Sequence, residues 1–144
     1  MVGRSRRKPL GGTVLDHGQR PVALDTCATN QPPADYAAIA ARYRLRHPEV
    51  PVIKNLDAKI LEAITTGKGS LDMSTWHTCK TTHCRAGWAI TLAGEKGHEL
   101  EEKYASERAG VMIYRASTGR VPNFFATTET AMEDIRACAG ADKE

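Results

Sequence analysis

The chain has 144 residues, of which 41% are hydrophobic, 26% charged and 6% aromatic, and its formal charge is +3. That length favours a single domain, and these fractions exclude a wholly disordered or fibrous protein. The longest apolar run free of charge and proline, from Ala86 to Gly94, is far shorter than a membrane span of about 20 residues. No apolar segment follows the basic start, as a secretion signal would require. We therefore expect a cytoplasmic protein whose four cysteines are reduced thiols.

Positive charge is concentrated near the amino terminus. Residues 1–54 hold nine Lys or Arg against four Asp or Glu, whereas residues 55–144 hold eleven against thirteen. Residues 1–33 lack a sustained apolar period and are rich in glycine and proline, which predicts a flexible basic arm. A basic region of this kind can contact nucleic acid or an acidic protein surface, or it can serve only as a solvated leader. The residues considered for such contacts are Arg4, Arg6, Arg7, Lys8, Arg42, Arg44 and Arg46.

Residues 34–54 are expected to form one helix followed by an extended connector. Asp35 suits the first turn of that helix, and Pro48 ends it at about His47. Basic side chains in its last turns complement the helix dipole, which explains them without any ligand.

Residues 55–144 are expected to form a helical domain, because apolar side chains repeat at helical spacing in several segments. The predicted helices cover about 56–66, 83–93, 98–104 and 106–118, with a last one capped by Thr127 or Thr128. Asn55 and Thr82 are the predicted caps of the first two, and residues 95–97 are predicted to form a turn. No segment alternates long enough to indicate a strand. The predicted fold is an all-α, compact bundle of about five or six short helices with one long structured loop.

That loop, residues 67–82, and the turn after it gather an unusual set of side chains. The set comprises both tryptophans, two cysteines and two histidines: Trp76, His77, Cys79, His83, Cys84 and Trp88. A loop of this length inside a small domain is usually functional or internally packed.

Zinc binding is one explanation of the set, since thiolate and imidazole are the usual zinc ligands. The spacing does not match the common finger or ribbon patterns, and neighbours on a helix such as His83 and Cys84 point about 100° apart. A site formed by His77, Cys79 and Cys84 stays open. A reactive thiol is a second explanation, because Cys84 is expected in the first turn of a helix, where the dipole lowers a thiol pKa. His77 or His83 would then act as its base, but no known nucleophile signature is present.

Structural packing is the third explanation and the one that we favour. Cys84, Trp88 and Leu92 are spaced i, i+4, i+8 and share one helix face. Gly87 lets a neighbouring segment, such as the loop around Trp76, come close to that helix. In this interpretation Trp76 and Trp88 are packing anchors, and function lies on the outside of the packed loop.

Residues 55–139 also carry a distinctive block, WHTCKTTHCRAGWA from Trp76 to Ala89, with Leu71-Asp72-Met73-Ser74 before it. Further on come Leu92-Ala93-Gly94-Glu95, Ile113-Tyr114-Arg115-Ala116-Ser117 and Phe124-Phe125. The chain resembles an uncharacterised family of small bacterial and phage proteins in these segments. The resemblance brings no activity, but its phage association implies a regulator or inhibitor of a host machine rather than a metabolic enzyme.

Three functions remain open on this basis. The first is a non-enzymatic module that has no cofactor and binds a protein partner. The second is an accessory protein that binds nucleic acid through its basic residues, without reading bases. The third is a zinc- or thiol-dependent protein centred on His77, Cys79, His83 and Cys84.

Overall fold

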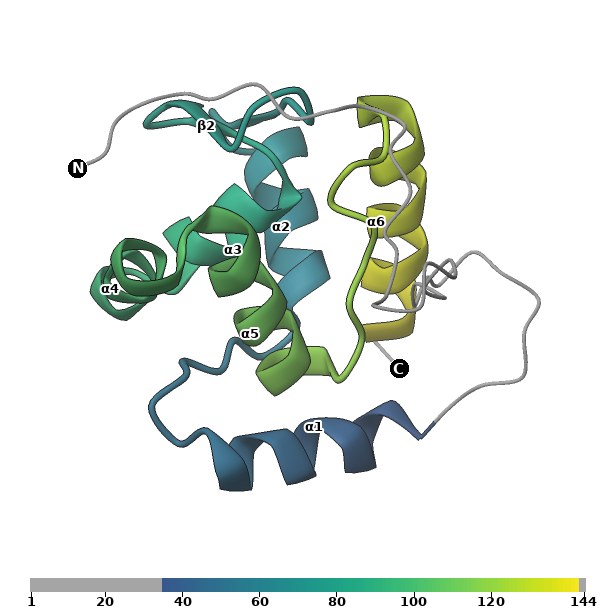
Figure 1. The fold of residues 1–144 in the computed structure, drawn as a ribbon. Helices are drawn as coiled ribbons and strands as arrows, with labels where there is room; N and C mark the ends of the chain where they lie inside the picture. Colours follow the sequence, from purple (N-terminus) through teal and green to yellow (C-terminus); the bar gives the residue numbers. More distant parts are fainter. Residues whose placement is uncertain (1–34, 143–144) are drawn as a thin grey trace, which may run out of the picture.

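Helices dominate residues 35–142, which are the part of the chain that the computed structural model describes (Figure 1). The six helices of this part are α1 (Tyr36–Arg46), α2 (Leu56–Thr65), α3 (Arg85–Leu92), α4 (Glu95–Tyr104), α5 (Ser106–Thr118) and α6 (Thr128–Asp142). The predicted helical bundle is therefore confirmed in outline. The predicted basic arm, with Arg4, Arg6, Arg7 and Lys8, lies outside the described residues.

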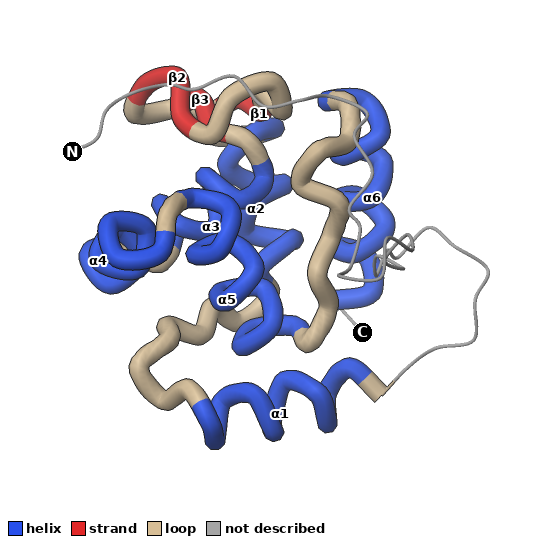
Figure 2. Tube along the Cα trace, viewed as in Figure 1, coloured by secondary structure: helices blue, strands red, loops and turns tan. Residues whose placement is uncertain are grey.

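A small sheet corrects the all-α prediction. Its strands are β1 (Ser70–Leu71), β2 (His77–Cys79) and β3 (Thr82–His83). β3 lies in the middle, parallel to β1 and antiparallel to β2 (Figure 2). Strands of two or three residues are too short to show an alternating pattern, so the sequence could not reveal them. The sheet pairs backbone groups of the long loop, as in the 2.8 Å bond from Ser70 N to Thr81 O.

α3 is the central helix of the bundle. Its residues from Arg85 to Ile90 are all buried, as expected for a helix that is apolar almost all round. α5 and α4 pack against it, while α2 packs against both α3 and α6 (Figure 1). None of the helices in the described range is long and apolar enough to cross a bilayer.

α1 lies across the carboxyl-terminal half of α5 at the edge of the bundle (Figure 1). Arg44 Nη1 donates to Ala116 O at 2.9 Å, and Ile53 N in the following connector donates to Ser117 Oγ at 2.8 Å. Buried Val50 and Ile53 add apolar contact to these polar ones. The helix and its connector are thus attached to α5.

Two predicted helix starts and one predicted capping bond need correction. Cys84, not Thr82, is the N-cap of α3, and its Sγ accepts a hydrogen bond from Gly87 N at 3.3 Å. Asn55 precedes α2 in a left-handed conformation and its side chain makes no capping bond.

α4 begins at Glu95 rather than His98, because Gly97 is not a turn residue but a residue that contacts α3. A Cβ on Gly97 would lie 2.2 Å from Ile90 O, so this glycine lets α4 pack directly on α3.

Candidate functional site

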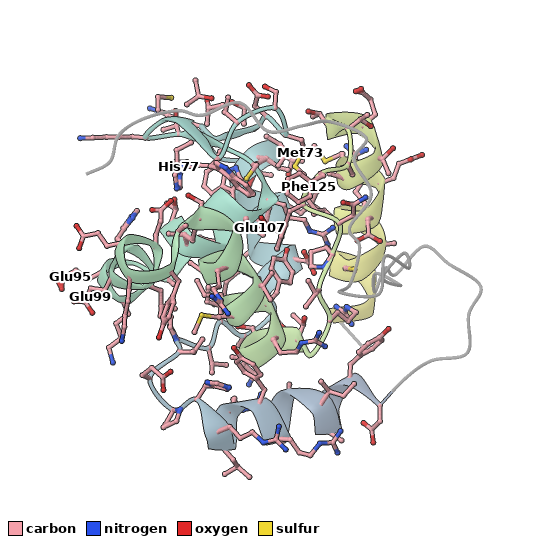
Figure 3. The ribbon with its side chains drawn as sticks, in the orientation of Figure 1. Met73, His77, Glu95, Glu99, Glu107 and Phe125 are labelled. Carbon is pink, nitrogen blue, oxygen red and sulfur yellow. The ribbon has the colours of Figure 1, made fainter. Side chains whose placement is uncertain are left out.

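Two tryptophans, one on α3 and one in the loop that leads into it, help to hold this loop in place. Trp88 is 6% exposed and its Nε1 donates to Ser70 O at 2.9 Å, which joins α3 to β1. Trp76 is half-buried, and its ring meets Phe125 edge-on with 5.9 Å between ring centroids. Met73, labelled in Figure 3, is fully buried, and its backbone N donates to Thr128 Oγ1 at 3.1 Å.

Gly87 marks the closest approach between this loop and α3. A Cβ at this position would lie 2.3 Å from Trp76 O and 2.9 Å from the His83 side chain. Glycine is thus the residue that fits under the Trp76 backbone, in line with the close approach inferred from the sequence.

His77 and His83 come together across the β2–β3 hairpin. Their Nδ1 atoms are 2.7 Å apart, and the two rings meet edge-on. Both rings have a further partner: His77 Nε2 lies 2.6 Å from Glu101 Oε2 on α4, and His83 Nε2 lies 2.9 Å from Lys80 O. Ser106 Oγ donates to the same Glu101 oxygen at 2.6 Å. We call His77, His83 and Glu101 the histidine cluster.

Hydrogen-bond partners fix several protons of the histidine cluster. A carbonyl only accepts, so His83 Nε2 carries a hydrogen and donates it to Lys80 O. The hydrogen between the two Nδ1 atoms belongs to one ring, and the other ring accepts it. Burial would raise the pKa of Glu101, but the hydrogen bonds from His77 and Ser106 lower it to about 2. Glu101 is therefore a carboxylate that accepts hydrogen bonds from His77 Nε2 and Ser106 Oγ.

The hydrogen bonds of the histidine cluster form a chain through three elements. The chain starts at the Ser106 hydroxyl, which donates to Glu101, and it ends at the Lys80 backbone carbonyl. The bond between His77 and Glu101 connects the β2–β3 hairpin to α4.

The two candidate cysteines of the loop lie in different environments. Cys79 is exposed, and hydrogen bonds with the Thr82 and Thr81 hydroxyls lower the pKa of its thiol to about 7. Cys84 is fully buried, so a substrate cannot reach its sulfur. Both are free thiols, whereas Cys138 on α6 is disulfide-bonded, which makes the expectation of reduced thiols wrong at that position.

The predicted zinc ligands do not converge. Between residues 35 and 142, no group of three or more His, Cys, Asp or Glu is placed to hold a metal ion. His77 and His83 use their facing nitrogens on each other, while Cys84 Sγ caps α3.

Sequence reasoning missed a buried ionic network around Arg85. This side chain is 2% exposed and makes a 2.9 Å bond to Asp57 Oδ1 on α2 and a 2.7 Å bond to Asp134 Oδ2 on α6. Its Nε donates to Tyr114 Oη on α5 at 2.9 Å, and that hydroxyl donates to Asp57 Oδ1. One charged residue thus connects four helices. The signal was present, since a lone arginine inside an apolar central helix must find buried acidic partners.

Charges within this network stabilise one another. Burial alone would lower the pKa of Arg85, but Tyr114, Asp57 and Asp134 together raise it above its ordinary value. Burial raises the pKa of Tyr114 well above its usual range, so its hydroxyl stays protonated. Asp57 Oδ2 has no hydrogen-bond partner among the described residues, and Arg120 Nη2 on the far side lies 3.8 Å from it. Two arginines thereby balance two buried aspartates.

The outer face of α1 combines apolar and basic side chains. Leu45 is 84% exposed, and Ala41 and Arg42 lie with it within about 100° of the helix circumference. Arg46 is exposed next to Arg42, one turn further on, and α1 contains no acidic residue. The three arginines predicted to form one basic face therefore do not share it. Arg42 and Arg46 point outward, whereas Arg44 is hydrogen-bonded to α5.

Comparison of the chain with protein-family models, with characterised proteins and with solved structures finds no match.

Proposed function

We propose that this protein is a non-enzymatic interaction module that docks an acidic protein surface through the outer face of α1. The observation that carries the proposal is Leu45, a large apolar side chain that is 84% exposed beside two outward-pointing arginines, Arg42 and Arg46. Isolated exposed leucines are common, but this one lies on a helix with basic residues and no acidic one. Apolar anchors with arginine beside them are typical of protein interfaces.

A protein partner explains this face better than a nucleic acid does. Phosphate binding uses several cations, but Arg44 is held by Ala116 O and leaves Arg42 and Arg46 on the outer face. Single-stranded nucleic acids also need exposed aromatic rings for stacking. The aromatic rings of α1 are not exposed: Tyr43 is half-buried and stacked on His47, and Tyr36 lies under Arg120.

The arrangement of the histidines and cysteines supports a role without catalysis. His77 and His83 satisfy each other and Glu101, while Cys84 is enclosed by α3 and the loop. The family resemblance of residues 55–139 extends the proposal to a regulator or inhibitor of a host protein complex. Its body would then hold α1 in a fixed position for docking.

Site-specific crosslinking tests this proposal in cells that produce the full chain. A photoreactive benzoylphenylalanine replaces Leu45 in one variant and the exposed Glu129, on α6, in a matched control. We expect a crosslinked protein from position 45 that is absent from position 129, with the crosslink in an acidic segment of the partner. The partner is then purified and its affinity is measured for wild type, Leu45→Asp and Arg46→Glu.

We expect each substitution to weaken binding at least tenfold, which is about 1.4 kcal/mol. Equal crosslinking from both positions, or unchanged affinity in both variants, would exclude α1 as the docking face. A crosslink to nucleic acid, with an affinity that falls steeply as salt rises, would support the nucleic-acid alternative instead.

A further inference from the structure

Cys138 on α6 is bonded to another sulfur, and neither of the other described cysteines is its partner. Cys79 and Cys84 are free thiols, whereas Cys138 is disulfide-bonded. The chain has four cysteines, so the candidate that remains within one molecule is Cys27, which lies outside the described residues. A cysteine of a second copy fits less well, because Cys138 is 1% exposed in a single copy and its sulfur is covered.

The start of α1 is connected to Cys138 by a short series of side-chain contacts. Arg120 lies over the Tyr36 ring, 5.5 Å from its centroid, and Arg120 Nη2 lies 3.8 Å from Asp57 Oδ2. Arg85 Nη2 in turn lies 2.9 Å from Asp57 Oδ1 and 3.8 Å from Cys138 Sγ. The remaining cysteine precedes Tyr36 by nine positions, which can span about 30 Å. The segment before α1 is therefore long enough to reach the sulfur on α6.

The surroundings of Cys138 suit a reduced sulfur as well as a bonded one. Cys138 Sγ lies 3.8 Å from Arg85 Nη2 and 3.8 Å from Asp134 Oδ2, which belongs to the preceding turn of α6. A thiol is both a weak acceptor and a weak donor, so a reduced Cys138 would accept from Arg85 and donate to Asp134. Breaking the disulfide thus gives a thiol that already has polar partners in the buried network.

We propose that Cys27 and Cys138 form a redox-controlled strap, which ties the segment before α1 to α6 and is opened by a dithiol. One thiolate of the dithiol attacks the sulfur of Cys27, because the sulfur of Cys138 is buried. A new S–S bond forms as the old one breaks, and the sulfur of Cys138 leaves with the electron pair and takes up a proton. The second thiol of the dithiol then displaces Cys27 in the same way, which yields two protein thiols and the oxidised dithiol.

The state of the strap changes how the basic arm is attached to the helical body. A closed strap ties the basic residues before position 27 to α6, whereas an open strap leaves them connected through the start of α1 alone. The inference does not depend on the proposed docking face, since neither Leu45 nor its neighbouring arginines take part in the disulfide.

Peptide mapping of the full chain tests the pairing. The chain is first treated with oxidised dithiothreitol and then digested without a reducing agent. Mass spectrometry should find a peptide containing Cys27 joined to one containing Cys138. Cys27→Ser should abolish this species, and the matched control Cys79→Ser should keep it. A bridge to another cysteine, a covalent dimer on a non-reducing gel, or Cys138 recovered as a free thiol would overturn the proposal.

A titration with reduced and oxidised dithiothreitol tests the switch. We expect the strap to open and close reversibly in the folded protein, while iodoacetamide leaves the buried thiol of Cys84 unmodified. The closed form should melt about 5 °C or more above the open form, since the bridge restricts about 110 residues of the unfolded chain. Cys27→Ser should melt as the open form does, with or without the dithiol. A bridge that opens only when Cys84 also becomes reactive would be a fixed structural bond and would contradict the switch.

Discussion

Replacing Arg85 by methionine should destabilise the protein more than any substitution on its surface. The change removes a 2% exposed guanidinium and leaves the carboxylates of Asp57 and Asp134 buried without the charge that they face. Breaking a buried ion pair from one side costs about 3–5 kcal/mol, whereas the whole free energy of unfolding of a domain is about 5–15 kcal/mol. Arg85→Met should therefore lose a large part of the stability of the fold.

Urea unfolding at neutral pH, followed by circular dichroism and tryptophan fluorescence, measures this loss. Arg42→Met on the outer face of α1 is the matched control and should change the free energy of unfolding by less than about 0.5 kcal/mol. The triple variant with Asp57→Asn and Asp134→Asn should recover part of the stability that Arg85→Met loses, because it leaves no buried carboxylate without Arg85. A loss below about 1 kcal/mol for Arg85→Met alone would refute this view of the network.

Three further predictions concern the loop and its contacts. Gly87→Ala should lower the free energy of unfolding by about 1–3 kcal/mol, since the new Cβ would lie 2.3 Å from Trp76 O, and an unchanged melting temperature would contradict this. Glu101→Gln should cost about 1–3 kcal/mol at neutral pH. The pKa of Glu101 is lowered from 4.5 to about 2, so the wild type should lose this extra stability as the pH falls between those values. The difference in the free energy of unfolding between wild type and Glu101→Gln should therefore become smaller over that range. A difference that stays constant would contradict this prediction. Iodoacetamide should modify Cys79 at a rate that rises most steeply near pH 7, where the pKa of this thiol lies. Cys84 should react only after the protein unfolds, because its sulfur is buried. Modification of Cys84 in the folded protein would show that our placement of that thiol is wrong.

The helices could be predicted from the sequence because their apolar side chains repeat at the period of a helix. α5 follows this pattern and ends before Gly119, where the predicted helix also ends. The start of α3 was wrong by two residues, because Cys84 supplies a capping sulfur where threonine was expected to supply oxygen. The sheet could not be predicted, since its pairing depends on how the loop folds and not on side-chain alternation.

Part of the candidate site could be predicted from the sequence. His77 and His83 stood out by their proximity in sequence, but Glu101 lies 24 residues beyond His77, and only the packing of α4 brings it there. The spacing of arginines in α1 likewise indicated a basic helix without showing which side faces α5. Arg44 and Arg46 are two residues apart and so point in different directions, Arg44 toward α5 and Arg46 away from it.

The most direct test of the account compares two variants in binding to the partner captured from position 45. Leu45→Asp alters the outer face of α1, whereas Cys79→Ser alters the exposed thiol of the loop. The account predicts that Leu45→Asp raises the Kd at least tenfold, about 1.4 kcal/mol, and that Cys79→Ser leaves it within about twofold. The opposite result, with binding lost in Cys79→Ser and kept in Leu45→Asp, would place the function in the loop and contradict the account.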